Sequence, residues 1–147
     1  MAFRLIPMDE GHLPAVAALE RACFSHPWTE AMLLEELRGE AALYLVAAGE
    51  DGTVLGYAGM RAVAGEGYLH NVAVAASARR QGVADALIGA LCRHGRAGLA
   101  FLTLEVRASN AAAVALYEKH GFAVVGRRKN YYDAPRQDAL LMTLEFT

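Results

Sequence analysis

The chain has 147 residues, of which 55% are hydrophobic and 20% charged, and its formal net charge at pH 7 is −2. This composition excludes disordered and collagen-like chains, and it offers no basic excess for binding nucleic acid through electrostatics. Two cysteines, Cys23 and Cys92, are too few for a disulfide scaffold, and no spacing of Cys and His predicts a metal site. The length predicts one domain, residues 1–147. Because neither a signal peptide nor a membrane-length apolar run is found, we expect the protein in the cytoplasm.

The first 74 residues predict a strand, two helices and then an antiparallel meander. Residues 3–8 are apolar enough for a strand, and Pro14 fits the first turn of a helix that continues to residue 22. The apolar stripe expected along this helix is formed by Leu13, Val16, Ala17 and Leu19-Glu20. Pro27 interrupts that pattern, and Thr29 can cap a second helix through residue 37. Its expected inward side chains are Met32, Leu33, Leu34 and Leu37. Three strands, 43–48, 54–62 and 68–74, follow with glycine-containing turns between them.

Helices and strands alternate in the second half of the chain. We expect a helix at 83–96, a strand at 101–106, and a helix that Asn110 caps and Gly121 ends. Two last strands, 122–126 and 139–146, are joined by a polar loop at 127–137. The fold class is therefore α/β or α+β, with helices covering a mixed sheet.

The most informative segment lies between an expected strand and an expected helix and reads Arg79-Arg80-Gln81-Gly82-Val83-Ala84. The free N–H groups of the first helical turn and the helix dipole favour an anion, and two arginines add positive charge. The segment suits a diphosphate held by backbone amides, although an ordinary turn with solvated arginines fits it too. Asp85 suits the helix dipole but would repel a phosphate. The segment has neither the Walker nor the dinucleotide-binding pattern.

This loop resembles the (Gln/Arg)-x-x-Gly-x-(Gly/Ala) loop of the GCN5-related N-acetyltransferases, which binds the pyrophosphate of acetyl-CoA. Three later segments are similar to the RimI branch, the ribosomal-protein-alanine N-acetyltransferases. They are Leu104-Glu105-Val106-Arg107-Ala108-Ser109-Asn110, Leu116-Tyr117-Glu118 and Arg127-Arg128-Lys129-Asn130-Tyr131-Tyr132. Phe24-Ser25-His26-Pro27-Trp28 also resembles a stretch of this branch.

The resemblance implies a mostly antiparallel sheet of about seven strands with about four helices, splayed between strands four and five. It implies acetyl-CoA as cosubstrate, without a metal. The implied acceptor is a protein N-terminus, with the alanine of a small-subunit ribosomal protein as the first choice. We expect neither a nucleic acid nor a membrane as partner, and a monomer is slightly favoured.

Two side chains are candidates for the chemistry. Glu105 lies in an apolar strand, where it is either salt-bridged, for instance to Arg107, or a general base. Tyr117 lies on the following helix, where it either packs in the core or protonates the leaving thiolate. The resemblance implies the base for Glu105 and the acid for Tyr117.

The remaining candidates bind the two substrates. Backbone groups of the strand before the loop would pair with the pantetheine arm, as an added strand does. Asn110 caps a helix and, by resemblance, contacts acetyl-CoA. The candidate cofactor-binding residues are Val72, Ala73, Val74, Arg79, Arg80, Gln81, Gly82, Val83, Ala84, Asp85 and Asn110. By resemblance, Arg128, Tyr131 and Tyr132 form one wall of a peptide groove; a solvated hairpin is the alternative.

Two other functions remain open. The same fold can acetylate a lysine or a small amine, or bind acyl-CoA without turnover.

An acidic group, Glu35, Glu36 and Glu40, either attracts a basic peptide or forms a solvated face. His70 either orients a water or is a hydrogen-bonded strand histidine, and the second is favoured.

Overall fold

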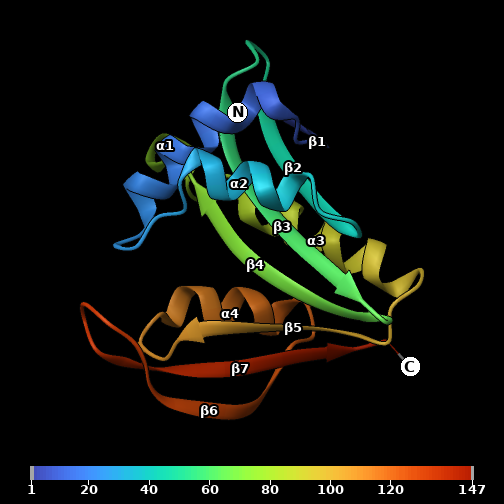
Figure 1. The fold of residues 1–147 in the computed structure, drawn as a ribbon, viewed down its shortest axis with the longest axis vertical. Coiled ribbons are helices and arrows are strands. Elements are labelled where there is room, and N and C mark those ends of the chain that lie inside the picture. The colour runs from blue at the N-terminus through green and yellow to red at the C-terminus, as the bar shows by residue number, and fades with distance from the viewer. Residues whose placement is uncertain (1, 147) are drawn as a thin grey trace. The chain divides into compact units, whose positions relative to one another are not determined.

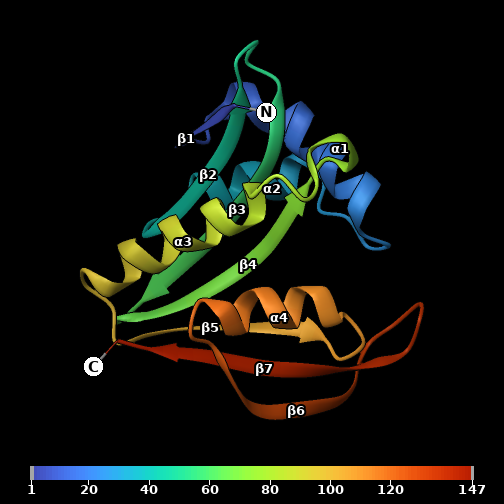
Figure 2. The same ribbon diagram turned by 180° about the vertical axis from the view of Figure 1, so that it is seen from behind.

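The computed structural model describes residues 2–146, which form seven β-strands, four α-helices and two short 3₁₀ helices (Figures 1 and 2). In chain order they are β1 (Phe3–Pro7), η1 (Glu10–His12), α1 (Leu13–Cys23), α2 (Glu30–Leu37), β2 (Ala42–Gly49), β3 (Val54–Val63), β4 (Glu66–Val74), η2 (Ala76–Ala78), α3 (Val83–Arg96), β5 (Phe101–Arg107), α4 (Ala111–Lys119), β6 (Ala123–Tyr132) and β7 (Gln137–Glu145).

The strands form one sheet in the order β1-β2-β3-β4-β5-β7-β6. The pairs β1–β2, β2–β3, β5–β7 and β6–β7 are antiparallel, whereas β4 and β5 are parallel. The described parallel pairs join Glu66, Gly67 and Tyr68 to Phe101, Leu102 and Thr103. The predicted mixed, mostly antiparallel sheet is thus confirmed.

The chain divides into two compact units. The first contains the residues up to Arg61 together with His70–Leu91, and the second contains Ala62–Leu69 and the residues from Cys92 onward. The first unit has strands covered on both faces. Helix α2 crosses in front of β2 and β3 in Figure 1, and α3 lies in front of these strands in Figure 2.

Apolar spacing explains why the helices of the first unit pack as they do. Helix α1 buries Leu13, Val16 and Ala17 along one stripe, which joins a core that also contains Leu33, Val46 and Tyr57. Thr29 caps α2 as predicted, because its Oγ1 accepts a hydrogen bond from the Met32 amide at 3.2 Å.

The prediction that Met32 points inward was wrong, since its side chain is 44% exposed. Helix α2 packs through Leu33, which is buried, and Leu37, one turn later on the same face, contacts the same core.

In the second unit, α4 lies alongside β5 and β7 in both ribbon views. Asn110 caps this helix, with its Oδ1 accepting from the Ala113 amide at 3.2 Å. After the helix, Gly121 has a φ of +100°, which glycine adopts without steric cost, so the predicted helix end is confirmed.

The predicted polar loop at 127–137 was wrong in extent. Strand β6 continues to Tyr132 and β7 begins at Gln137, so Arg128, Tyr131 and Tyr132 are strand residues and the turn spans only residues 133–136. Strand β6 is the edge of the sheet and almost entirely exposed. Charged side chains are common on edge strands, and their polarity made this strand resemble a loop.

No helix within residues 2–146 is long and apolar enough to cross a membrane.

Candidate active site

The loop before α3, in the first unit, has the backbone that an anion site needs. Arg80 and Gly82 have positive φ values of +65° and +81°. The amide of Ala86 donates to the Gly82 carbonyl at 2.9 Å as the first turn of α3 closes. The amides of Val83 and Ala84 precede this bond and have no partner within the helix. An added Cβ at Gly82 would meet no atom within 4 Å, so a ligand can approach the backbone here.

Side chains of this loop fold back onto β4. The Arg79 Nε donates to the Val74 carbonyl at 3.4 Å, and its Nη2 lies 3.7 Å from the Cys23 Sγ. The Cys23 thiol also donates to the Val74 carbonyl at 3.6 Å. The Arg79 charge therefore lies at the end of β4, where the Val74 carbonyl already accepts two donors.

Glu105, in the second unit, stands on a strand with strict alternation. The buried positions of β5 are Leu102, Leu104 and Val106, so Glu105 and Arg107 share the opposite face. This pattern explains how a carboxylate fits an apparently apolar run: its two apolar neighbours face the core and it does not.

The two oxygens of the Glu105 carboxylate differ. Oε1 lies 3.8 Å from the Arg128 Nε, which makes Arg128 rather than Arg107 the described ion-pair partner. The Tyr131 hydroxyl hydrogen-bonds to this carboxylate, and that bond is the main reason why the pKa of Tyr131 is raised. Oε2 is buried and has no hydrogen-bond partner among the described residues. A carboxylate oxygen without a hydrogen-bond donor has unfilled acceptor sites, which a general base needs.

Tyr117 is buried in α4, and its ring packs edge-to-face on Phe122 with centroids 5.8 Å apart. Burial, with a further contribution from Tyr132, raises the pKa of Tyr117 to about 12. The phenol is therefore a weaker acid than a free tyrosine, and it stays protonated throughout the neutral range.

An aromatic and cationic cluster surrounds Glu105. Tyr131 and Tyr132 meet edge-to-face with centroids 5.1 Å apart. The Arg128 Cζ lies 5.8 Å from the centroid of the Tyr131 ring, and the Arg107 Cζ lies 4.3 Å from that of the Tyr132 ring. The predicted residues Arg128, Tyr131 and Tyr132 are thus brought together with Glu105. Sequence reasoning considered Arg107 only as an ion-pair partner of Glu105 and missed its contact with Tyr132.

The first unit holds a buried carboxylate that sequence reasoning placed in an apolar stripe. Glu20 is fully buried and accepts from the Trp28 amide at 2.8 Å, the Tyr57 hydroxyl at 2.5 Å and the Asn71 Nδ2 at 3.0 Å. A carboxylate on the buried face of a helix needs such donors, and this was the missed signal.

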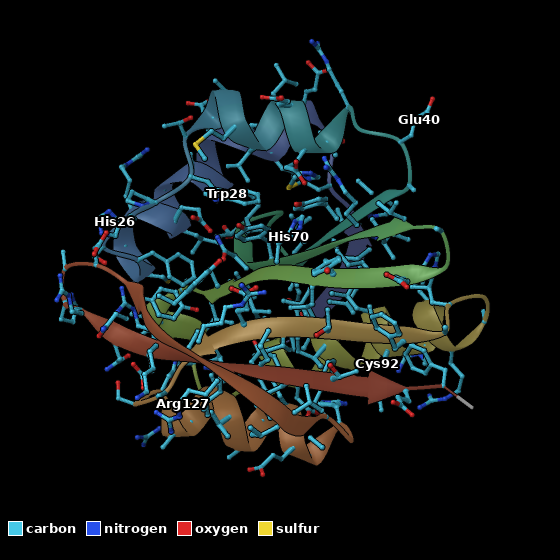
Figure 3. All side chains as sticks on the ribbon, turned by 60° about the horizontal axis from the view of Figure 1, so that its bottom comes forward. His26, Trp28, Glu40, His70, Cys92 and Arg127 are labelled. Carbon is cyan, nitrogen blue, oxygen red and sulfur yellow. The ribbon has the colours of Figure 1, made fainter. Side chains whose placement is uncertain are left out.

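His70 lies beside this network (Figure 3 labels it with Trp28), and the two rings meet edge-on with centroids 5.5 Å apart. Its Nδ1 lies 2.8 Å from the Tyr44 hydroxyl, so the favoured interpretation, a hydrogen-bonded strand histidine, is confirmed. Burial lowers the pKa of His70. Glu36 pairs with Arg61 at 2.6 Å and is largely buried, so it does not belong to a solvated face.

Comparisons with known proteins agree on one family. Residues 13–122 match the model of the acetyltransferase (GNAT) family. The chain is 38% identical over 140 residues, 93% of each chain, to the [ribosomal protein bS18]-alanine N-acetyltransferase of Escherichia coli. The crystal structure of the ribosomal-protein-S18-alanine N-acetyltransferase from Escherichia coli matches with a TM-score of 0.92 and 35% identity, covering 99% of this chain and 95% of that one.

A NatC complex bound to Gag peptide and CoA matches with a TM-score of 0.85 and 26% identity over 100% of both chains. Within residues 2–146, no group of His, Cys, Asp and Glu side chains is arranged to hold a metal ion.

Proposed function

Because this chain belongs to the acetyltransferase (GNAT) family and is an N-acetyltransferase that uses acetyl-CoA, we propose that it acetylates the N-terminal α-amine of a protein. The proposed acceptor is the N-terminal alanine of a small-subunit ribosomal protein. The 38% identity to an enzyme of that activity, over 93% of both chains, supports this acceptor.

The observation that best supports this reaction is that one oxygen of the Glu105 carboxylate has no hydrogen-bond partner among the described residues. Oε2 is buried and has no described partner, while Oε1 lies 3.8 Å from the Arg128 Nε. We assign Oε2 as the atom that takes the amine proton, directly or through one water. Loss of that proton frees the nitrogen lone pair to attack the acetyl carbonyl.

When bound, acetyl-CoA supplies the acetyl group as a thioester. The loop at Gly82 is proposed to hold its pyrophosphate through the amides of Val83 and Ala84, with Arg80 and Gln81 at the rim. Val72 and Val74 are proposed to meet the pantetheine arm through their backbone, and Asn110 to contact the same ligand. The positive φ of Gly82 and the open space beside it support this fit.

Tyr117 is proposed to stabilise the leaving thiolate. With its pKa raised to about 12, full proton donation to a thiol of pKa about 8.5 is uphill by about 5 kcal/mol. A hydrogen bond from the phenol to the developing thiolate has no such cost, so we assign donation of a hydrogen bond as its main role. The proton can reach sulfur later from solvent.

The chemistry of the acceptor favours an α-amine. With a pKa of about 7.7–8.0, roughly a tenth of α-amines are neutral at pH 7, against about 0.04% of lysine side chains. The difference of a few hundredfold means that one carboxylate suffices for an N-terminal acceptor.

Mass spectrometry tests the acceptor directly. A basic peptide starting with Ala-Arg is incubated with the enzyme and acetyl-CoA, beside the same peptide with a blocked N-terminus. We expect one acetyl group to be added to the free peptide only. Acetylation of both peptides would assign lysine instead. Binding of acetyl-CoA without acetylation of either peptide would point to a small amine or to a non-catalytic acyl-CoA-binding domain.

A further inference from the structure

We propose that Arg107 is a positioning residue: its guanidinium fixes the turn between β6 and β7 and, with it, the Tyr131–Tyr132 pair at the end of β6. The proposal rests on the proposed function, in which Glu105 is the base, and on the expectation that Arg128, Tyr131 and Tyr132 form one wall of the peptide groove. Arg107 itself is not assigned a contact with either substrate.

The guanidinium binds the main chain of the turn at two points. Nη1 donates to the Pro135 carbonyl at 2.9 Å, and Nη2 donates to the Asp133 carbonyl at 3.1 Å. The planar, rigid fork of an arginine suits two acceptors held at a fixed spacing. One side chain therefore bridges both sides of Ala134.

The same guanidinium also packs on the last residue of β6. Its Cζ lies 4.3 Å from the centroid of the Tyr132 ring, a cation–π contact. Tyr132 in turn meets Tyr131 edge-to-face. Arg107 is thus connected to the Tyr131 ring through a single intervening side chain.

The backbone of the turn needs such support. Ala134 has a φ of +42° and Asn130 a φ of +53°, both in the left-handed region, which is sterically unfavourable for residues with a Cβ. Such conformations persist where surrounding contacts hold them. The two carbonyls that Arg107 binds flank Ala134 directly.

Other contacts hold the ends of the hairpin. The Ala108 amide donates to the Asp138 carbonyl at 3.0 Å, and the Gln137 Nε2 donates to the Ser109 Oγ at 2.7 Å. The Asp138 carboxylate accepts from the Asn130 amide at 2.9 Å. The first two contacts hold the start of β7 to the segment after β5, and the third joins β6 to β7. Removing Arg107 should therefore loosen the turn without unfolding the hairpin.

The arrangement predicts a selective defect. Arg107 stands two residues after Glu105 on the same face of β5, so the strand that carries the base also supports the hairpin beside it. None of the described Arg107 contacts involves the loop assigned to acetyl-CoA. Loss of Arg107 should raise the KM for the peptide acceptor and leave the KM for acetyl-CoA unchanged.

The test compares wild type with Arg107→Ala and Arg107→Lys, and uses Arg136→Ala as the control, because Arg136 is an exposed arginine of the same turn. In Arg107→Ala we expect the KM for the peptide to rise by about 10-fold or more, with the KM for acetyl-CoA within about twofold. Lys keeps the charge but not the fork, so Arg107→Lys should recover little of the loss. Added guanidinium should lower the KM for the peptide in Arg107→Ala but not in wild type or the other variants.

Amide hydrogen exchange supplies a readout that needs no acceptor. In both Arg107 variants, exchange over residues 129–137 should rise by about 10-fold or more, while exchange over α4 stays at the wild-type rate. Unchanged exchange in this segment, or a KM that rises equally for both substrates, would overturn the proposal. If wild type acetylates no free N-terminus, the proposed function fails, and the exchange result still decides whether Arg107 fixes the turn.

Discussion

Two glutamates, one in each compact unit, differ in how completely their carboxylates are hydrogen-bonded. Glu20 in the first unit is fully buried, and three donors from Trp28, Tyr57 and Asn71 converge on its two oxygens. Glu105 in the second unit is only partly buried, yet its Oε2 has no described partner. The more deeply buried carboxylate is therefore the better satisfied.

The difference separates a structural carboxylate from a chemical one. A buried carboxylate whose acceptor sites are filled cannot take a proton without breaking hydrogen bonds, so it serves to hold chain segments together. An oxygen left without a donor carries a cost in stability, and proteins retain such costs at functional sites. Substitutions at Glu20 should thus change stability, and those at Glu105 should change rate.

The largest expected effect is the loss of turnover caused by the substitution Glu105→Gln. The amide cannot accept the amine proton, so turnover should fall by about 10³-fold, with acetyl-CoA affinity and the thermal midpoint close to wild type. Steady-state rates with the free N-terminal peptide, together with cofactor titration, check this.

Glu118→Gln, an exposed glutamate next to Tyr117 on α4, is the matched control and should retain wild-type turnover. A Glu105→Gln enzyme with a normal rate between pH 6 and 9 would remove Glu105 as the base.

The reverse outcome is expected for Glu20→Gln. The amide replaces one acceptor by a donor and faces a converging set of donors, which should lower the free energy of unfolding by about 3 kcal/mol. The folded fraction should keep its turnover within a few-fold. Urea unfolding and rates at a temperature well below the midpoint separate the two quantities. A large loss of turnover with unchanged stability would give Glu20 a role in the reaction rather than in stability.

The sequence was sufficient to predict the elements with strong local signals. Thr29 and Asn110 are caps whose side chains bond as expected, and Gly121 ends α4. The candidate site was predicted mainly by its resemblance to a family, with Glu105 also marked by its place in an apolar strand.

Features that depend on distant contacts were not predictable. Glu20 looked like part of an apolar stripe because its donors, Tyr57 and Asn71, are 37 and 51 residues away in sequence. Strand β6 was mistaken for a loop because charged residues are tolerated at an edge, and the position of the edge follows from the whole sheet. The contact of Arg107 with the turn carbonyls depends on where the hairpin ends, which the sequence did not specify.

A smaller effect on rate is expected for Tyr117→Phe. Loss of the hydroxyl removes the proposed hydrogen bond to the thiolate, and the chemical step should slow by about 10²-fold. Because burial raises the pKa of Tyr117 to about 12, its ionisation should not limit the rate below pH 9. Single-turnover rates check both points, and Tyr68→Phe, an exposed tyrosine of β4, is the control. An unaltered single-turnover rate would exclude Tyr117 from the reaction.

The smallest expected effect concerns His70 and the pH dependence of stability in the first unit. Burial, with Arg61 acting in the same direction and Glu36 opposing it, lowers the pKa of His70 in the folded protein. Its other described neighbours, the Tyr44 hydroxyl and the Trp28 ring, are uncharged. In the unfolded chain a histidine binds a proton near pH 6.5, so the unfolded state gains protons first as the pH falls.

Stability from His70 is therefore present above pH 6.5 and is lost as the pH falls below that value, by at most about 1.4 kcal/mol per pH unit. Urea unfolding of wild type and His70→Gln between pH 7.5 and 5 measures the difference, with exposed His94→Gln as the control. Wild type should lose more stability than His70→Gln over this range, and His94→Gln should follow wild type. Parallel curves for wild type and His70→Gln would mean that His70 titrates alike in both states.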